Sequence, residues 1–246
     1  MIGVDLFSGA GGMSLGALQS GIDVQYAVEL DQFASMTFIK NHSSVRMFTQ
    51  DIRSVTASMF TELDRNKPLI VFGGPPCQGF STSNQKSRTI TNEKNWLFIE
   101  YLRIVKELKP DWVVFENVKG ILNLDKGKFF EMIQAELKEC VEDIKVNKIG
   151  TADFGVPQRR DRVIIVGGSY DLTRDFHMEA ISTVQKDGQR SLLPTVIGAE
   201  DAIGDLPELT PGEDGSSYPY KFPASNAYQK FMRGEIDAEE YLKTYK

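Results

Sequence analysis

Leu69-Ile70-Val71-Phe72-Gly73-Gly74-Pro75-Pro76-Cys77 is the stretch of this sequence that most constrains the fold. Its four apolar residues predict a short buried strand. The glycines allow a sharp turn, and the prolines fix φ and stiffen the chain that follows. A cysteine after so rigid a corner is placed to act as a nucleophile, because stiff backbone fixes the direction of attack. A small buried side chain in a turn is an equally good interpretation, since free cysteines are often buried.

The composition is that of an ordinary globular protein. The chain has 246 residues, of which 41% are hydrophobic and 25% charged, enough for one large α/β domain or a domain with an appendage. It contains no apolar run that could span a bilayer and no signal-peptide pattern, so we expect a cytoplasmic protein. Two cysteines and two histidines predict neither a disulfide framework nor a metal site.

The net charge of −6 argues by itself against a nucleic-acid-binding protein, because such domains usually carry a basic surface. The motifs described below point the other way.

The N-terminal segment predicts a strand, a glycine-rich turn and a helix. Residues 3–7 form the strand, Ser8-Gly9-Ala10-Gly11-Gly12 the turn, and residues 13–20 the helix. A second strand, residues 23–28, ends in Glu29, an acid placed to bind ribose hydroxyls. These signals indicate a cofactor that contains a nucleoside, and they fit a nicotinamide cofactor or S-adenosylmethionine equally.

Further signals follow the later strands. After a helix at 33–41, a strand at 45–49 ends in Gln50-Asp51-Ile52. There the acid can accept from an adenine amine while the aliphatic side chain packs on the ring, or it simply caps a helix. The next helix spans residues 96–108, and the strand at 111–115 ends in Glu116-Asn117-Val118. Five signals thus fall at the carboxyl ends of five strands, where open α/β sheets bind ligands.

The remaining sequence divides near residue 170. It predicts a helix over 127–140 that buries Cys140, a strand over 144–149, a basic loop over 154–162 and a strand over 163–166. We expect residues 1–170 to form a catalytic cofactor-binding domain. Residues 171–246 lack strand–helix alternation, and they predict a connector with a small helical patch and no packed second domain.

These motifs, in this order, resemble those of the DNA (cytosine-5) methyltransferases. Val4–Gly12 is similar to the family's S-adenosylmethionine loop, and Gly74–Ser81 to its nucleophile motif. Glu116-Asn117-Val118 is similar to its glutamate motif, and Gln158–Arg162 to its late basic motif. The resemblance covers roughly residues 1–168. It implies an open, mostly parallel Rossmann-like α/β sheet with helices on both faces and S-adenosylmethionine as cofactor, with S-adenosylhomocysteine as product.

The resemblance also implies residue roles. Cys77 attacks carbon 6 of a cytosine, Glu116 holds a proton toward ring nitrogen 3, and carbon 5 is methylated. The implied catalytic residues are Cys77, Glu116, Arg160, Arg162, Pro76 and Asn117. The implied cofactor-binding residues are Phe7, Gly9, Ala10, Gly11, Gly12, Glu29, Leu30, Asp51, Ile52, Pro75 and Leu97.

The expected substrate is double-stranded DNA in a bacterial restriction–modification setting. The cytosine must be flipped out of the duplex, and we expect the polar loop over residues 81–95, with Lys86, Arg88 and Lys94, to close over the strand. Two late motifs of the family are not visible, which predicts a missing C-terminal segment or a second polypeptide that carries target recognition.

Three alternatives remain at this point. A transfer-RNA cytosine methyltransferase shares the motifs, and a nicotinamide-dependent oxidoreductase shares the early strands and turn. The third is a subunit that is inactive without its C-terminal partner.

Overall fold

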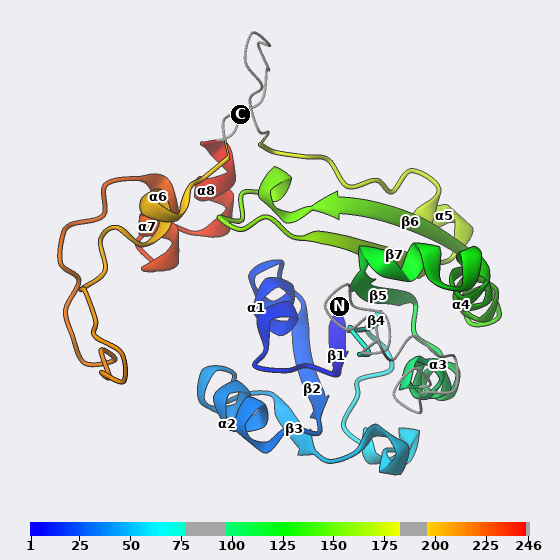
Figure 1. Ribbon diagram of the computed structural model, residues 1–246. Helices are drawn as coiled ribbons and strands as arrows, with labels where there is room; N and C mark the ends of the chain where they lie inside the picture. The colour runs from blue at the N-terminus through cyan, green and yellow to red at the C-terminus, as the bar shows by residue number, and fades with distance from the viewer. Residues whose placement is uncertain (77–96, 183–195, 245–246) are drawn as a thin grey trace, which may run out of the picture. The chain divides into compact units, whose positions relative to one another are not determined.

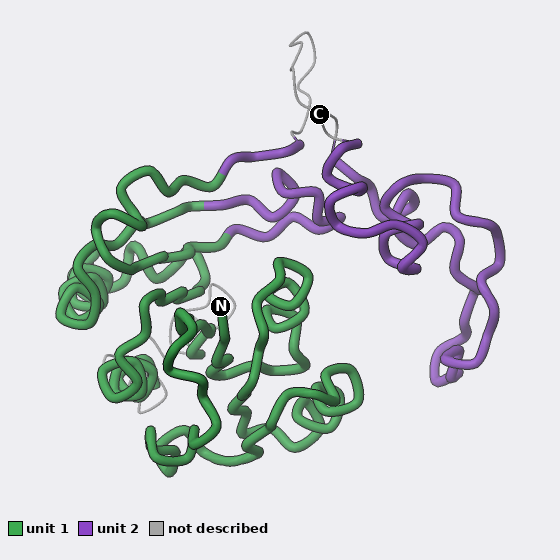
Figure 2. The backbone as a smooth tube through the Cα atoms, turned by 180° about the vertical axis from the view of Figure 1, so that it is seen from behind, with its two compact units in different colours: residues 1–148, 162–178 green, residues 149–161, 179–246 purple. Residues whose placement is uncertain are grey.

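The computed structural model describes residues 1–76, 97–182 and 196–244 (Figure 1). The chain groups into two compact units, one of residues 1–148 and 162–178 and the other of residues 149–161 and 179–246 (Figure 2). Segment 149–161 joins the second unit because the backbone N–H groups of Ile181 and Ser182 both donate to the carbonyl of Asp153. The division at residue 170 remains a prediction about domains.

A seven-stranded sheet runs through the chain in the order β3-β2-β1-β4-β5-β7-β6. Neighbouring strands from β3 to β5 are parallel, and β7 is antiparallel to β5. The predicted open, mostly parallel α/β sheet is therefore confirmed. The strands are β1 (Ile2–Leu6), β2 (Asp23–Glu29), β3 (Arg46–Thr49), β4 (Leu69–Gly73), β5 (Trp112–Val118), β6 (Asp143–Gly150) and β7 (Asp161–Gly168).

Alternating side chains of β4 show why helices cover both faces of the sheet. Leu69 and Val71 belong to the hydrophobic core that contains α3 (Leu97–Leu108) and α4 (Lys128–Lys138). Ile70 and Phe72 belong to the opposite core, with α1 (Gly12–Gln19) and α2 (Gln32–Asn41). A central strand buried on both faces reads as a continuous apolar run, as β4 does.

Helix α3 is held by its apolar side chains and by one hydroxyl group. Its buried residues recur at helical spacing, and the hydroxyl of Tyr101 reaches the carbonyl oxygens of Val71 and Val114 at 3.3 and 3.0 Å. The helix ends before Lys109, whose φ is +48°, and Pro110 prevents its continuation. The Tyr101 hydroxyl thus holds α3 against β4 and β5.

Strand β5 is longer than the sequence predicted. We expected Glu116-Asn117-Val118 to follow the strand, but all three residues lie within it. The cause is the antiparallel pairing with β7, which continues to Val118 opposite Arg162. A pairing between strands this far apart in the chain leaves no local pattern, so the sequence does not predict it.

Short helical turns complete the first unit. They are η1 (Ile52–Ser54), η2 (Ala57–Met59), η6 (Lys119–Gly127) and α5 (Tyr170–Thr173). Among the described residues, no helix combines the length and the apolar character needed to cross a membrane.

The second unit contains η7 (Thr151–Phe154), α6 (Ala199–Ile203), α7 (Ala227–Met232) and α8 (Ala238–Lys243). A buried ion pair between Arg233 and Asp205 fastens α7 to the segment after α6, with the Arg233 Nε 3.0 Å from the carboxylate. The rings of Phe231 and Tyr241 stack at 4.8 Å between α7 and α8. These contacts make a small helical cluster within the second unit.

Candidate active site

The carboxyl ends of the five parallel strands meet along one edge of the sheet. The register places the end of β1 beside those of β2 and β4, and β5 next to β4. Glu29 and Glu116 lie near the carboxyl ends of β2 and β5, and Phe7, Asp51 and Pro76 follow β1, β3 and β4. Of the five predicted signals, the glycine-rich turn, Glu29, Asp51 and Glu116 are therefore present at this edge, and the fifth, Cys77, lies outside the described residues.

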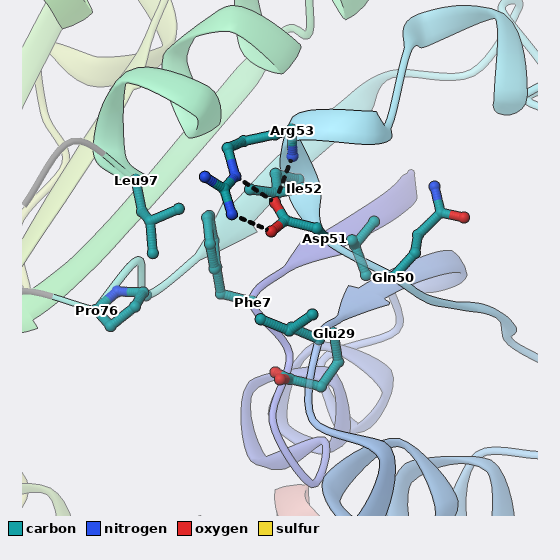
Figure 3. Close-up of a pocket in the computed structure, with 11 residues that line it drawn as sticks. Phe7, Glu29, Gln50, Asp51, Ile52, Arg53, Pro76 and Leu97 are labelled. Carbon is teal, nitrogen blue, oxygen red and sulfur yellow. Dashed lines mark hydrogen bonds and ion pairs between the residues drawn. The ribbon is translucent and has the colours of Figure 1, made fainter. Parts of the chain in front are cut away.

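A cavity of about 490 Å³ opens at this edge (Figure 3). It receives side chains from the segments after β1, β2, β3 and β4 and from the start of α3. The described residues that line it are Phe7, Val28, Glu29, Leu30, Gln50, Asp51, Ile52, Arg53, Gly74, Pro76 and Leu97.

Phe7 enters the cavity from a left-handed backbone conformation. Its φ is +62°, which is uncommon for a residue with a Cβ and costs free energy. The turn sends its ring into the cavity, in the direction of Leu97 and Pro76 (Figure 3). The apolar walls formed by these side chains suit a flat aromatic ring.

Glu29 fixes the glycine-rich turn after β1. One carboxylate oxygen accepts from the backbone N–H of Gly9 at 2.8 Å, and the other accepts from Asp31 at 2.7 Å. The acid at the end of β2 therefore holds two loops in place, and each oxygen keeps acceptor capacity for a further donor.

Asp51 combines the two roles that the sequence left open. Its side chain lines the cavity, and it also caps η1 by accepting from the backbone N–H of Arg53 at 2.9 Å. The same carboxylate forms an ion pair with the Arg53 guanidinium, with 2.6 Å between Nη2 and Oδ2. Hydrogen bonds from Arg53 hold the pKa of Asp51 below its usual value, so the group remains an acceptor.

The other predicted cofactor residues stand outside the cavity lining. Gly9, Ala10, Gly11 and Gly12 form the turn that Glu29 holds, and Gly9 and Gly11 have φ values of +56° and +96°. Pro75 is buried and does not line the cavity. Pro76, predicted to be catalytic, lines it instead.

Glu116 and Arg162 form the second feature of this edge. The Arg162 Nε lies 2.6 Å from a carboxylate oxygen of Glu116, across the β5–β7 pairing. The other oxygen rests on Gly74, where a Cβ would stand only 2.8 Å away. Two residues predicted to be catalytic are thus in direct contact, beside the backbone that leads to Cys77.

Asn117 ties β5 to the turn after β4. Its side-chain amide donates to the carbonyl oxygen of Pro75 at 3.0 Å, and the residue is 4% exposed. This bond holds the backbone two residues before Cys77. Cys77 itself and the loop over residues 81–95 lie outside the described residues.

Arg160 belongs to the second unit. Its backbone N–H donates to the Thr151 hydroxyl at 3.1 Å, and its carbonyl accepts from the Thr151 N–H at 2.9 Å. The role of Arg160 as a catalytic residue remains a prediction.

Sequence reasoning missed four residues that line the cavity: Val28, Gln50, Arg53 and Gly74. One of them had a usable signal. An aspartate that caps a turn can also pair with an arginine two positions later, as Asp51 does with Arg53.

The comparisons with known proteins agree with this geometry. The family model for C-5 cytosine-specific DNA methylases matches residues 1–241. The chain belongs to this family.

Two curated relatives of this methyltransferase chain are named type II methyltransferases. M.AquIA of Picosynechococcus sp. is 36% identical over 223 residues, which are 85% of this chain and 90% of that protein. M.DdeI of Desulfomicrobium norvegicum is 32% identical over 94% of this chain and 54% of that protein. A solved structure described as a DNA modification methyltransferase from an E. coli prophage aligns with a TM-score of 0.65 and 29% identity. The alignment covers 85% of this chain and 56% of that one.

The methyltransferase chain thus spans about half the length of M.DdeI and of the prophage protein, and nearly all of M.AquIA.

Proposed function

We propose that this chain methylates carbon 5 of a cytosine flipped out of double-stranded DNA, through a covalent adduct with Cys77. The observation that carries the proposal is the Glu116–Arg162 pair, which lies against Gly74 at the same sheet edge as the cavity. An acid–base group and a cationic fork are thereby fixed next to the backbone that carries the thiol.

The lining of the cavity fits S-adenosylmethionine. Asp51 is an acceptor for the adenine amine, Glu29 for the ribose hydroxyls, and Phe7, Ile52 and Leu97 offer apolar surface to the ring. When bound, S-adenosylmethionine supplies an electrophilic methyl group.

The chain's own residues then account for the activation of the base. The Cys77 thiolate bonds to carbon 6, which pushes electron density onto carbon 5 and ring nitrogen 3. Glu116 donates a hydrogen bond or proton to nitrogen 3, and Arg162 binds the base's carbonyl oxygen. After methylation, a base removes the carbon-5 proton and the carbon–sulfur bond breaks, which restores Cys77.

The target base must leave the duplex for this chemistry, because carbon 6 is inaccessible within stacked base pairs. We assign the closing role to the loop over residues 81–95, whose Lys86, Arg88 and Lys94 would contact phosphates. Neutralising these three residues should flatten the salt dependence of DNA binding.

Target recognition is proposed to come from a further segment. M.DdeI extends well beyond the region that matches this chain, whereas M.AquIA has nearly the same length. The segment can lie on the same polypeptide or on a second one. A basic surface on it would offset the net charge of −6 of this sequence.

The test is transfer of labelled methyl groups from S-adenosylmethionine to mixed-sequence duplex DNA or to transfer RNA. It uses this chain alone and with a C-terminal partner polypeptide. We expect methylated DNA, unmethylated RNA, and loss of activity in Cys77→Ser. Glu116→Gln should lower kcat by more than about 100-fold, because it removes the acid–base group. Methylation of transfer RNA alone would favour the RNA-directed alternative, and cofactor binding without transfer in any mixture would favour the inactive subunit.

A further inference from the structure

Arg53 closes one side of the cavity without belonging to any motif singled out in the sequence. Its side chain folds back from η1 onto Asp51 at the rim of the cavity (Figure 3). The Nε donates to Oδ1 at 3.0 Å, and Nη2 donates to Oδ2 at 2.6 Å. This is the two-pronged geometry that a guanidinium forms with a carboxylate and a lysine cannot reproduce.

The hydrogen-bond count of Asp51 shows what this contact does. A carboxylate offers about four acceptor positions. Oδ1 receives two donors from Arg53, its backbone N–H at 2.9 Å and its Nε at 3.0 Å. Oδ2 receives one donor, Nη2, so one acceptor position on Oδ2 remains. Arg53 therefore fixes the rotamer of the Asp51 side chain. It leaves one acceptor position, on Oδ2, for a donor from a ligand.

The surroundings favour a ligand donor at that position. The side chain of Asp51 is 29% exposed and lines the cavity, whereas that of Arg53 is 66% exposed. An ion pair this open to solvent contributes little to folding stability, so its effect should be on the ligand rather than on the fold.

We propose that Arg53 is a positioning residue that presents Asp51 as an acceptor to the purine amine and so makes the site select a 6-amino over a 6-oxo purine. The inference rests on the proposed function, since it assumes that the cavity binds S-adenosylmethionine. A 6-oxo purine has an acceptor where adenine has a donor, and it would face the lone pair of Oδ2. A site with a polar group fixed in this way rejects the mismatched analogue.

The experiment measures equilibrium binding of S-adenosylhomocysteine and S-inosylhomocysteine by calorimetry. The proteins are wild type, Arg53→Gln, Arg53→Lys and Arg174→Gln. Arg174 is the matched control, because it is an exposed arginine of the same unit that pairs with Asp175 at 3.2 Å. We expect Arg53→Gln to weaken S-adenosylhomocysteine binding about threefold to tenfold and to reduce the preference for the amino purine by a similar factor. Arg53→Lys should restore only part of the preference, and Arg174→Gln should match wild type.

A double-mutant cycle with Asp51→Asn separates positioning from a structural effect. If Arg53 acts through Asp51, Arg53→Gln should change the preference little once Asp51 is replaced. If Arg53→Gln weakened the binding of both ligands equally, the inference would be contradicted. Tighter binding of S-adenosylhomocysteine by Arg53→Gln would also contradict it, because Arg53 would then hinder ligand binding. Wild-type protein that binds neither ligand would overturn the proposed function itself. Wild-type preference retained in Arg53→Gln would overturn only the inference.

Discussion

At the scale of single residues, Asp5 has the most unusual environment among the described carboxyl groups. It is fully buried in β1, and one oxygen accepts from the Ser14 hydroxyl at 2.6 Å. Its other oxygen has no partner among the described residues. Burial raises the pKa of Asp5 from 3.8 to about 7, with a further contribution from the charge of Glu29.

Asp5 should therefore make the fold less stable as the pH rises. The contribution of such a carboxyl to the stability of the folded state is fully present at pH values below its pKa in the unfolded chain. This contribution is lost as the pH rises to the pKa of the carboxyl in the folded state. Between pH 5 and pH 6.5, wild type should lose about 2 kcal/mol relative to Asp5→Asn in denaturant unfolding. Asp23→Asn, at the exposed start of β2, is the control. Parallel stability profiles for wild type and Asp5→Asn would show that the carboxyl does not titrate in this range.

The turn at Gly11 depends on its contact with the imidazole ring of His42. A Cβ on Gly11 would stand 2.4 Å from the His42 Nε2, and its φ of +96° disfavours any side chain. The same imidazole nitrogen lies 3.1 Å from the Gly11 carbonyl oxygen and can donate to it. The imidazole thus packs against the glycine-rich turn and can hydrogen-bond to it.

Gly11→Ala should lower the free energy of unfolding by about 2–4 kcal/mol, from strain and from the clash. In a His42→Ala background the strain remains, and so does the close approach to Phe38, whose Cδ2 would lie 2.8 Å from the new Cβ, so the same substitution should cost about 1–3 kcal/mol. Denaturant unfolding of the four proteins in the cycle gives this difference. Costs that add would mean that the turn moves away from His42 without resistance.

Single residues were only partly predictable from sequence. Glu29 and Asp51 were found because each follows a strand at the position where nucleosides are bound. Arg53 was missed, because its only signal was its spacing of two residues from Asp51, which is weaker than a periodic pattern. Asp5 stands between the apolar residues Val4 and Leu6, which is a sign of burial in the sequence. The sheet geometry was needed to recognise that sign.

At the scale of elements, α3 holds the turn η1, which follows Asp51 on one side of the cavity. The Nη2 of Arg103 donates to the carbonyl oxygens of Ile52 and Val55 at 3.0 and 2.9 Å. Its remaining nitrogens bind Glu100 and Glu107 at 2.8 and 2.9 Å. One guanidinium therefore fixes η1, which begins with the residue after Asp51.

Arg103→Lys should loosen η1 while leaving α3 folded, since an ammonium cannot satisfy two carbonyls and two carboxylates together. We expect faster amide hydrogen exchange at Ser54 and Val55 and a stability loss of about 1–3 kcal/mol. Lys106→Gln, which removes an exposed partner of Glu136 from the same helix, is the control. Unchanged exchange at η1 in Arg103→Lys would show that other contacts hold this turn.

Helices and strands were predicted well where the spacing of hydrophobic residues was regular. The helices α1, α2 and α3 and the strands β1 to β4 were predicted from hydrophobic patterns and glycine turns. The extension of β5 through Val118 could not be predicted, because it depends on pairing with β7, some 45 residues later in the chain. That pairing is what brings Arg162 to Glu116.

At the scale of the whole molecule, the first unit carries the described cavity and the Glu116–Arg162 pair, and the second unit carries Arg160. The family model extends over both units, to residue 241. The sequence motifs covered the first unit well, because strand ends and glycine turns leave local patterns. The second unit has short helices joined by irregular segments, and such structure is fixed by tertiary contacts such as Arg233–Asp205 rather than by local pattern.

A C-terminal partner should therefore change DNA affinity more than cofactor affinity. If a further segment carries target recognition, adding it should strengthen duplex binding and leave S-adenosylhomocysteine binding within about twofold. Filter binding and calorimetry on the same preparations measure the two affinities. Equal DNA affinity with and without the partner would place recognition within this chain.

The most direct test of the account is the covalent adduct at Cys77. Duplex DNA containing 5-fluorocytosine has no carbon-5 proton to lose, so the adduct formed after methylation should persist on a denaturing gel. We predict a DNA-linked band that requires S-adenosylmethionine, appears with this chain and its partner segment, and is absent in Cys77→Ser. A band of equal intensity in Cys77→Ser, or methylation of ordinary DNA with no band on the fluorinated duplex, would contradict covalent catalysis by this cysteine.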